Sequence, residues 1–160
     1  MRILGIDPGI GRMGWGVIDV VSQKPQVVGY GCLETEVNSE VSGRLKLVYE
    51  FTTELFERYQ PDALATEELF FSNNAKTAFS VGQARGVVLL AAAQAGVPIT
   101  IYTPMHVKLA VSGYGKADKN QVGQMVKTIL KLESIPKPDD TADALAIALT
   151  HAFSHKMKKL

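Results

Sequence analysis

Residues 3–9 have the sequence Ile-Leu-Gly-Ile-Asp-Pro-Gly, in which a short apolar run ends at an acid and a turn signal. We interpret the apolar run as a buried strand that ends at Asp7, because a Pro-Gly pair favours a turn. Two further β-rich runs follow at residues 15–21 and 27–33, divided by Ser-Gln-Lys-Pro at residues 22–25. Three strands in such close succession predict an antiparallel meander.

The period of the apolar residues then changes from that of a strand to that of a helix. Leu45, Val48, Leu55 and Phe56 fall on one helical face, and Pro-Asp at residues 61–62 ends this helix. A short buried strand, a long helix and another strand come next, at residues 63–66, about 75–94 and 99–102. Alternation of strand and helix predicts that this part of the sheet is parallel.

Helical segments close the chain. Asp118 and Gln121 have the spacing of a capping box at the start of one of them. The last helix is expected from about Asp139, as its N-cap, to His155, with an apolar stripe that includes Leu145 and Leu149. The whole order predicts an α/β fold of the ribonuclease H-like type: a mixed five-stranded sheet, with three antiparallel strands and then parallel strands, flanked by helices.

The composition predicts one globular domain over residues 1–160, with 46% hydrophobic and 21% charged residues. A single cysteine, Cys32, excludes an internal disulfide. The longest fully apolar run, at residues 87–93, is far shorter than the roughly 20 residues that span a bilayer, and no signal segment is visible. We therefore expect a cytoplasmic protein.

Net charge is only +1, but residues 101–160 hold 9 lysines against 5 acids, which favours phosphate binding there.

Acidic residues stand at three informative places. Asp7 ends the first strand, Glu67 and Glu68 end the fourth, and Asp140 and Asp143 lie three residues apart in the last helix. Each has an ordinary explanation, such as capping the turn or interacting with the helix dipole. The sequence alone does not choose between the two glutamates, because neighbouring side chains of a strand point to opposite faces. The glycines that follow Asp7 could instead cradle a nucleotide phosphate.

Taken together, acids that converge on one point repel each other unless cations neutralise them. Carboxylate oxygens suit Mg²⁺ or Mn²⁺, and the chain lacks a Cys/His set for zinc. A pair of such ions, about 3.5–4 Å apart, would stabilise the attacking and leaving oxygens of a phosphoryl displacement. The acids therefore predict metal-dependent hydrolysis of a phosphodiester.

Four motifs resemble those of the RuvC family of Holliday-junction resolvases, in the same order and spacing over essentially the whole chain. They are residues 3–9, Glu-Glu-Leu-Phe at 67–70, Gly-Gln-Ala-Arg-Gly at 82–86 and Asp-Thr-Ala-Asp-Ala-Leu-Ala at 140–146. The resemblance implies a homodimeric, Mg²⁺-dependent endonuclease, with two ions per site, that nicks two opposed strands of a four-way junction and leaves 5′-phosphate ends. It further implies branch-migration partners of the RuvA and RuvB type.

The resemblance also implies site residues. Asp7, Glu67, Asp140 and Asp143 match its catalytic, metal-binding acids, which favours Glu67 over Glu68; position 68 is Gln in the family pattern, and Asp140 is the most variable of the four. Phe70 matches a residue that stacks on an unpaired base, with Phe71 beside it. Lys108 and Lys119 match basic positions near the scissile phosphate. Arg85 and Lys116 are further candidates for DNA binding, although an ion pair or a solvated surface would equally explain them.

Three other functions are compatible with part of these motifs. An actin- or Hsp70-like ATPase needs two lobes, and 160 residues supply one. An rRNA-processing nuclease of the same fold should lack the Phe70-Phe71 pair and the full helical acid pair. A junction-binding module without catalysis would have no need for all four acids.

Overall fold

A central sheet of five strands organises the protein. The computed structural model describes residues 1–69 and 75–157, with side chains described for 1–69 and 77–155. The strands lie in the order β3-β2-β1-β4-β5, and β1 pairs antiparallel with β2 but parallel with β4. This confirms the predicted mixed sheet. The strands are β1 (Arg2–Asp7), β2 (Arg12–Val21), β3 (Lys24–Glu34), β4 (Ala63–Glu67) and β5 (Ile99–Tyr102).

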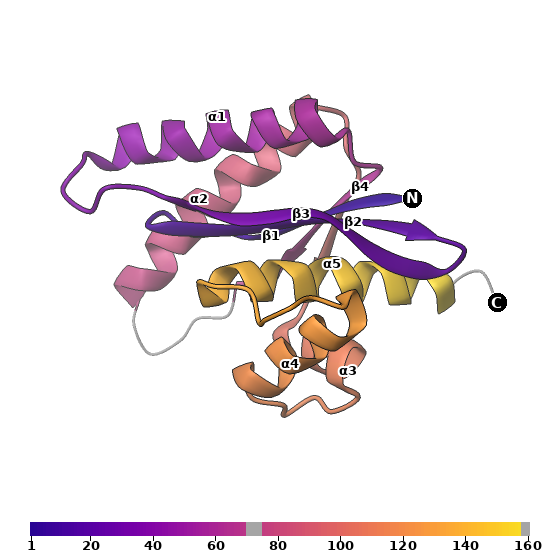
Figure 1. Cartoon of the computed structure of the whole chain (residues 1–160). Coiled ribbons are helices and arrows are strands. Elements are labelled where there is room, and N and C mark those ends of the chain that lie inside the picture. Colours follow the sequence, from indigo (N-terminus) through magenta and orange to yellow (C-terminus); the bar gives the residue numbers. More distant parts are fainter. Residues whose placement is uncertain (70–74, 158–160) are drawn as a thin grey trace.

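Helices cover both faces of the sheet (Figure 1). On one face lie α1 and α2; on the other lies α5, and α3 and α4 pack against the side of α5 that faces away from the sheet. Leu4, Ile6 and Val88 belong to the core beneath α1 and α2, whereas Ile3 and Leu145 belong to the core around α5. The helices are α1 (Val41–Tyr59), α2 (Ala75–Gln94), α3 (Pro104–Ser112), α4 (Lys119–Leu130) and α5 (Asp139–Met157).

The turn between β2 and β3 is tighter than the sequence predicts. Only Ser22 and Gln23 form it, with φ of 49° and 66°, and Lys24 and Pro25 already belong to β3. Left-handed backbone at two successive residues matches the twist of a two-residue hairpin. Pro25 is tolerated in the strand because β3 is an edge of the sheet, where its missing N–H breaks no ladder bond.

Helix α5 is buried more completely than a single apolar stripe implies. From residue 141 to residue 152 every side chain is buried except that of Asp143, which is partly exposed. The reason is that α5 lies between the sheet and the pair α3 and α4, so both of its sides are covered. Asp139 is its first helical residue rather than the expected N-cap, and its carboxylate pairs with Lys137 at 3.2 Å. The capping box of Asp118 and Gln121 is confirmed.

Glycines bring α5 unusually close to the sheet. A Cβ at Gly5 would overlap the carbonyl oxygen of Ala144, and one at Gly14 would overlap the carbonyl oxygen of Asp140. A Cβ at Gly16 would press into the side chain of Leu145. The glycines of β2 are therefore explained by helix packing rather than by a nucleotide cradle. They set the distance between the backbone of Asp140 and the sheet.

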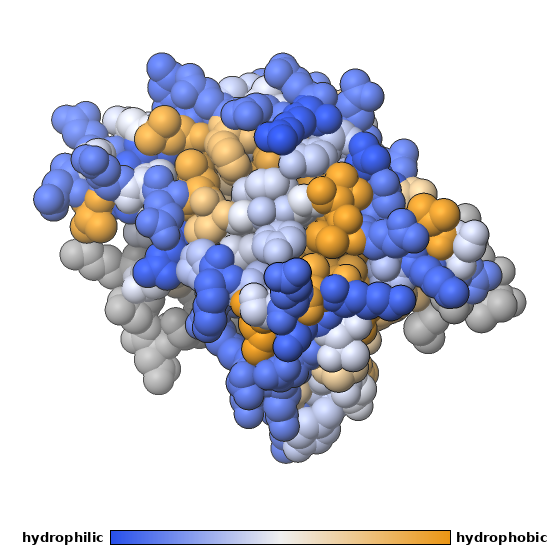
Figure 2. All heavy atoms as spheres, viewed as in Figure 1, coloured by the Kyte–Doolittle hydropathy of each residue, from blue (hydrophilic) through white to orange (hydrophobic). Residues whose placement is uncertain are grey.

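The surface is a mixture of polar and apolar areas. On the face seen in Figure 2, hydrophilic side chains surround separate apolar patches. Val28 and Tyr30 of the edge strand β3 are exposed to 41% and 44%. Within the described ranges, no helix has the length and hydropathy needed to cross a membrane.

Replacing Gly14 by alanine tests the contact between α5 and β2. We expect the Gly14→Ala protein to lose about 1–3 kcal/mol of unfolding free energy, as overpacked cores do, because the new methyl meets backbone atoms that cannot rotate away. The measurement is urea unfolding followed by circular dichroism. Gly43→Ala is the control: a Cβ there meets nothing within 4 Å, and alanine favours helix α1. Equal stability of the two variants would contradict the packing argument.

Candidate active site

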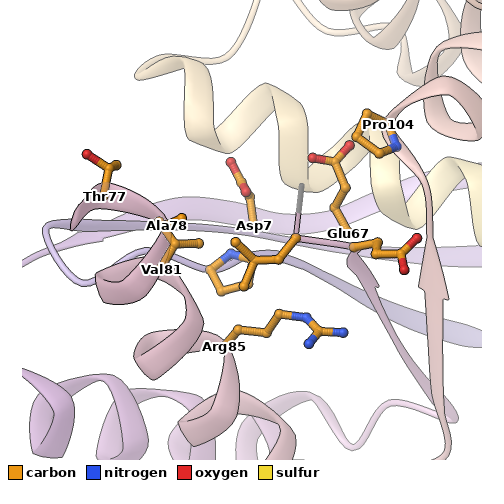
Figure 3. A pocket seen from close by; sticks show the side chains of 10 residues that line it. Asp7, Glu67, Thr77, Ala78, Val81, Arg85 and Pro104 are labelled. Atoms are coloured by element: carbon orange, nitrogen blue, oxygen red, sulfur yellow. The ribbon is translucent and has the colours of Figure 1, made fainter. Parts of the chain in front are cut away.

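Two acids meet where β1 and β4 end side by side. These strands pair in parallel, with Ile6 opposite Thr66, so Asp7 and Glu67 occupy neighbouring positions at the same end of the sheet. The side chains of each strand alternate between its faces. Because Ile3 and Ala65 belong to the core around α5, Asp7 and Glu67, which have the same parity, face α5 as well. Figure 3 shows both carboxylates pointing to this side.

The same alternation separates the two glutamates. Glu68 is exposed, and its backbone N–H donates to the carbonyl oxygen of Tyr102 at 2.7 Å. It contributes to a cavity beside α2, but it does not line the cavity of about 360 Å³ in which Asp7, Glu67 and Asp143 come together. Strand geometry therefore places Glu67, and not Glu68, next to the helical acid.

The two acids of α5 lie in different surroundings. Asp143 lines the cavity of Asp7 and Glu67, and Lys119 Nζ lies 3.0 Å from its Oδ2. Asp140 lines a neighbouring cavity of about 460 Å³, where it pairs with Arg12 at 3.7 Å. Its charge still raises the pKa of Asp7. The site therefore consists of a group of three acids with a fourth at its edge.

Burial and mutual repulsion dominate the electrostatics. Burial raises the pKa of Asp7 to about 8, and the charges of the other three acids add to this. Burial, and then the charge of Asp143, raises the pKa of Glu67 to about 7, although two nearby lysines oppose the shift. Burial likewise raises the pKa of Asp143 in spite of its bond from Lys119. The protein holds these carboxylates where their negative charge is poorly compensated.

Two lysines supply part of the missing positive charge. Lys108 and Lys119 both line the cavity of the three acids, as the resemblance implies. The hydrogen bond to Asp143 raises the pKa of Lys119, so this lysine stays charged. Lys119 pairs with Asp143 and Arg12 pairs with Asp140, whereas Asp7 and Glu67 form no ion pair within the described residues. That electrostatic deficit is what a bound metal ion can satisfy.

The donor set fits a hard divalent cation. All of its members are carboxylates, and carboxylate oxygens are the ligands of Mg²⁺, Mn²⁺ and Ca²⁺ rather than of softer metals. Within residues 1–69 and 75–157, no three His, Cys, Asp or Glu side chains already stand close enough to form a metal cage. Repulsion between like charges and the pull of Lys119 and Arg12 account for this spread.

The other predicted DNA contacts differ in position. Arg85 reaches from α2 along the face of the sheet opposite to the carboxylates and lines the cavity beside α2 (Figure 3). Among the residues that the structure describes, its buried Nε has no hydrogen-bond partner. Lys116 is exposed in the loop between α3 and α4. Phe70 and Phe71 lie outside the described residues. Arg12 is a further cation of this region that no sequence pattern indicates, because only the pairing of β2 with β3 and the approach of α5 bring it beside Asp140 and Glu34.

Comparison with known proteins identifies close relatives. Residues 3–151 match the model of the family described as crossover junction endodeoxyribonuclease RuvC. The proteins of that name from Brevibacillus brevis and Desulforamulus reducens are 55% and 53% identical over 152 residues, which are 95% of this chain and 92% or 93% of the relative. The solved structure of Thermus thermophilus RuvC in complex with a Holliday junction substrate has a TM-score of 0.93 and 42% identity, with 99% of this chain and 96% of that one covered.

The raised pKa of Asp7 predicts how the protein responds to pH. Folding lifts this pKa from 3.8 to about 8, so the folded protein binds the proton more tightly than the unfolded chain. Ionisation of Asp7 therefore destabilises the metal-free fold progressively as pH rises from about 4 to about 8. In a chelator we expect Asp7→Asn to melt above the parent protein at pH 8, with a difference that shrinks toward pH 4.

Asp19 provides a control of opposite sign. A hydrogen bond from Arg2 lowers the pKa of Asp19, so its ionised form stabilises the fold. Asp19→Asn should therefore melt below the parent protein at pH 8, and this loss should fade at pH values low enough to protonate Asp19. Thermal melts over the pH series measure both effects. A lower melting temperature for Asp7→Asn at pH 8 would show that its carboxylate does not carry uncompensated charge.

Proposed function

This chain belongs to the RuvC family of crossover junction endodeoxyribonucleases, and we propose that Asp7, Glu67, Asp140 and Asp143 bind its metal and hydrolyse the phosphodiester bonds of a Holliday junction. Nucleases of this family depend on divalent metal ions. We propose Mg²⁺ as the ion, two per site, with Mn²⁺ able to replace it. The observation that supports this most directly is the facing of Asp7 and Glu67 toward Asp143 in one cavity.

The metal would supply an activated water and neutralise charge on the phosphate. The carboxylates of β1, β4 and α5 would hold and orient it, because each comes from a regular element rather than from a loop. The water oxygen would form a bond to phosphorus as the bond from phosphorus to the 3′ oxygen breaks. The 3′ oxygen would take up a proton, which leaves a 5′-phosphate and a 3′-hydroxyl. Lys108 and Lys119 line the same cavity, so their ammonium groups can contact the scissile phosphate as its negative charge grows.

The acids would not contribute equally. Asp7, Glu67 and Asp143 share a cavity, whereas Asp140 lies beside it and pairs with Arg12. We therefore assign Asp140 the peripheral role, as a ligand of the second ion.

Groups around the site would hold the DNA. Arg85 lines a cavity that also includes Asp7 and Glu67, and its buried Nε has no hydrogen-bond partner within the described part of the chain, which supports a contact with the junction. Phe70 would stack on an unpaired base at the junction centre, with Phe71 next to it, and Lys116 would bind the backbone. Stacking of this kind contributes about 1–3 kcal/mol per base.

A homodimer would place two sites on one junction, whose approximate two-fold symmetry requires two cuts. Helix α2 offers a surface for it: Phe79 and Leu90 are exposed to 70% and 54%, and Gly86 between them leaves the backbone open. Phe79, Gly86 and Leu90 are separated by about two turns and then one turn of the helix, so they lie on the same face of α2. Family membership also supports RuvA- and RuvB-type proteins as branch-migration partners and a cytoplasmic site of action.

Cleavage of a synthetic four-way junction tests the proposed function. With Mg²⁺ we expect paired nicks in two opposed strands of the junction and none in a linear duplex of matching sequence; with a chelator we expect none in either. Asp7→Asn and Asp143→Asn should reduce the cleavage rate by at least about 10³-fold, as the loss of key catalytic groups does. Asp140→Asn should reduce it less. Gel electrophoresis of end-labelled strands measures the rate and the positions.

Binding measurements identify the reason for any loss of cleavage. Asp7→Asn should still bind the junction, because it removes a metal ligand and leaves the cationic groups in place. Equal cutting of junction and duplex would contradict structure-specific resolution, and strong binding without cutting under any divalent ion would instead support a non-catalytic module. Cutting of RNA alone would favour an rRNA-processing nuclease.

Leu90→Glu tests the proposed dimer surface. A charge in the centre of an apolar contact should convert the protein to a monomer, and nicks in the two strands should then become uncoupled. Leu47→Glu is the matched control, because Leu47 is also an exposed helical leucine, at 48%, but lies on α1. Sedimentation equilibrium reports the mass of each variant. A dimeric Leu90→Glu protein would exclude this face of α2.

A further inference from the structure

A polar network ties the loop after Asp7 to the first turns of α1. The backbone N–H of Thr35 donates to the carbonyl oxygen of Gly11 at 3.0 Å, and its hydroxyl donates to the carbonyl oxygen of Ile10. Arg44 Nε in turn donates to the Thr35 hydroxyl oxygen at 2.8 Å. The hydroxyl is thereby satisfied as both donor and acceptor, and the guanidinium of Arg44 is fixed in place.

The network leaves the charge of Arg44 unneutralised. Over the ranges that the structure describes, no carboxylate forms an ion pair with Arg44, in contrast to Arg2 and Arg12, which both have acidic partners. A guanidinium carries five N–H donors, and the bond to Thr35 uses one of them. Arg44 therefore presents a held, cationic donor group with spare hydrogen-bonding capacity.

This group stands at the same end of the sheet as the carboxylates. The guanidinium donates to Thr35 and lies near Gly11. Both of these residues line the cavity that is also lined by Arg12 and Asp140. The guanidinium lies beside the loop, since a Cβ at Gly11 would be in van der Waals contact with its Nη2 at 3.4 Å. Lys108 and Lys119 line the other cavity, that of Asp143. Cations therefore flank the acids on two sides.

We propose that Arg44 binds a backbone phosphate of the junction strand on the Asp140 side of the site. A strand that crosses a cluster of acids must be held by cations on either side of the reacting phosphate, since phosphate and carboxylate repel each other. Arginine suits this role because its planar donor group matches phosphate oxygens, and a fixed side chain loses little entropy on binding. The inference rests on the proposed function for its DNA substrate but needs no cleavage to be tested.

Arg44→Gln separates a phosphate contact from a structural role. The glutamine amide can still donate to Thr35, so the loop keeps its anchor while the charge is lost. We measure junction affinity in chelator over a series of salt concentrations. The affinity at low salt should fall several-fold, and the slope of log K against log salt should decrease by about 0.9 for each bound protomer. Melting temperature should change little.

Lys46→Gln is the matched control, because Lys46 is a cation of the same helix that already pairs with Glu50 at 3.6 Å. It should leave the salt slope unchanged. Thr35→Val removes the anchor but keeps the charge, so it should weaken binding without altering the slope. An unchanged slope for Arg44→Gln overturns the proposal, even if cleavage slows, since that result assigns Arg44 to loop positioning alone. Failure of the parent protein to cut junctions would count against the proposed function and leave this test intact.

Discussion

The close approach of α5 to β1 and β2 is the contact on which the site depends. Gly5, Gly14 and Gly16 present bare backbone to the helix, and any side chain at the first two would overlap its carbonyl oxygens. Helix and sheet are each stable elements, but their separation decides whether Asp143 reaches the acids that end β1 and β4. Because protein cores are close-packed, a shift of one turn of α5 would move the whole face of the helix that packs on the sheet. The glycines therefore help to set the geometry of the proposed active site.

The same contact creates an electrostatic problem that the fold only partly solves. Bringing carboxylates together in a half-buried cavity raises the pKa of Asp7 to about 8 and that of Glu67 to about 7. Structural packing alone would favour neutral side chains at these positions. The fold instead retains acids and pairs Asp143 with Lys119 and Asp140 with Arg12. The negative charge of Asp7 and Glu67 is left to be neutralised from outside. A cost in stability at this position is consistent with the proposal that a metal ion and a DNA backbone bind there.

Most of the secondary structure and the residue types of the site could be predicted from the sequence, because the local patterns are strong. The spacing of apolar residues and the turn residues predicted most strands and helices. The capping box of Asp118 and Gln121 correctly predicted the start of α4. The extent of burial around α5 could not be predicted, since α3 and α4 cover its outer side through contacts that no local pattern encodes. Strand alternation shows that Glu67 and Glu68 point apart, but only the register of β4 against β1 shows which one shares a face with Asp7. The predicted site is therefore a set of residue types at strand and helix ends, and tertiary packing selects among them.

The pair Asp140 and Asp143 shows where reasoning from helix spacing reaches its limit. Residues three apart differ by roughly 60° around an α-helix and about 4.5 Å along it. They share a side in a coarse sense, which is all that the sequence indicates. In the structure that small rotation turns Asp143 toward Lys119 and the strand ends, and Asp140 toward Arg12 at the start of β2. Each acid consequently has its own cation and its own cavity. The unequal roles proposed for the two follow from this rotation, because Asp143 shares a cavity with Asp7 and Glu67 whereas Asp140 lines the neighbouring one.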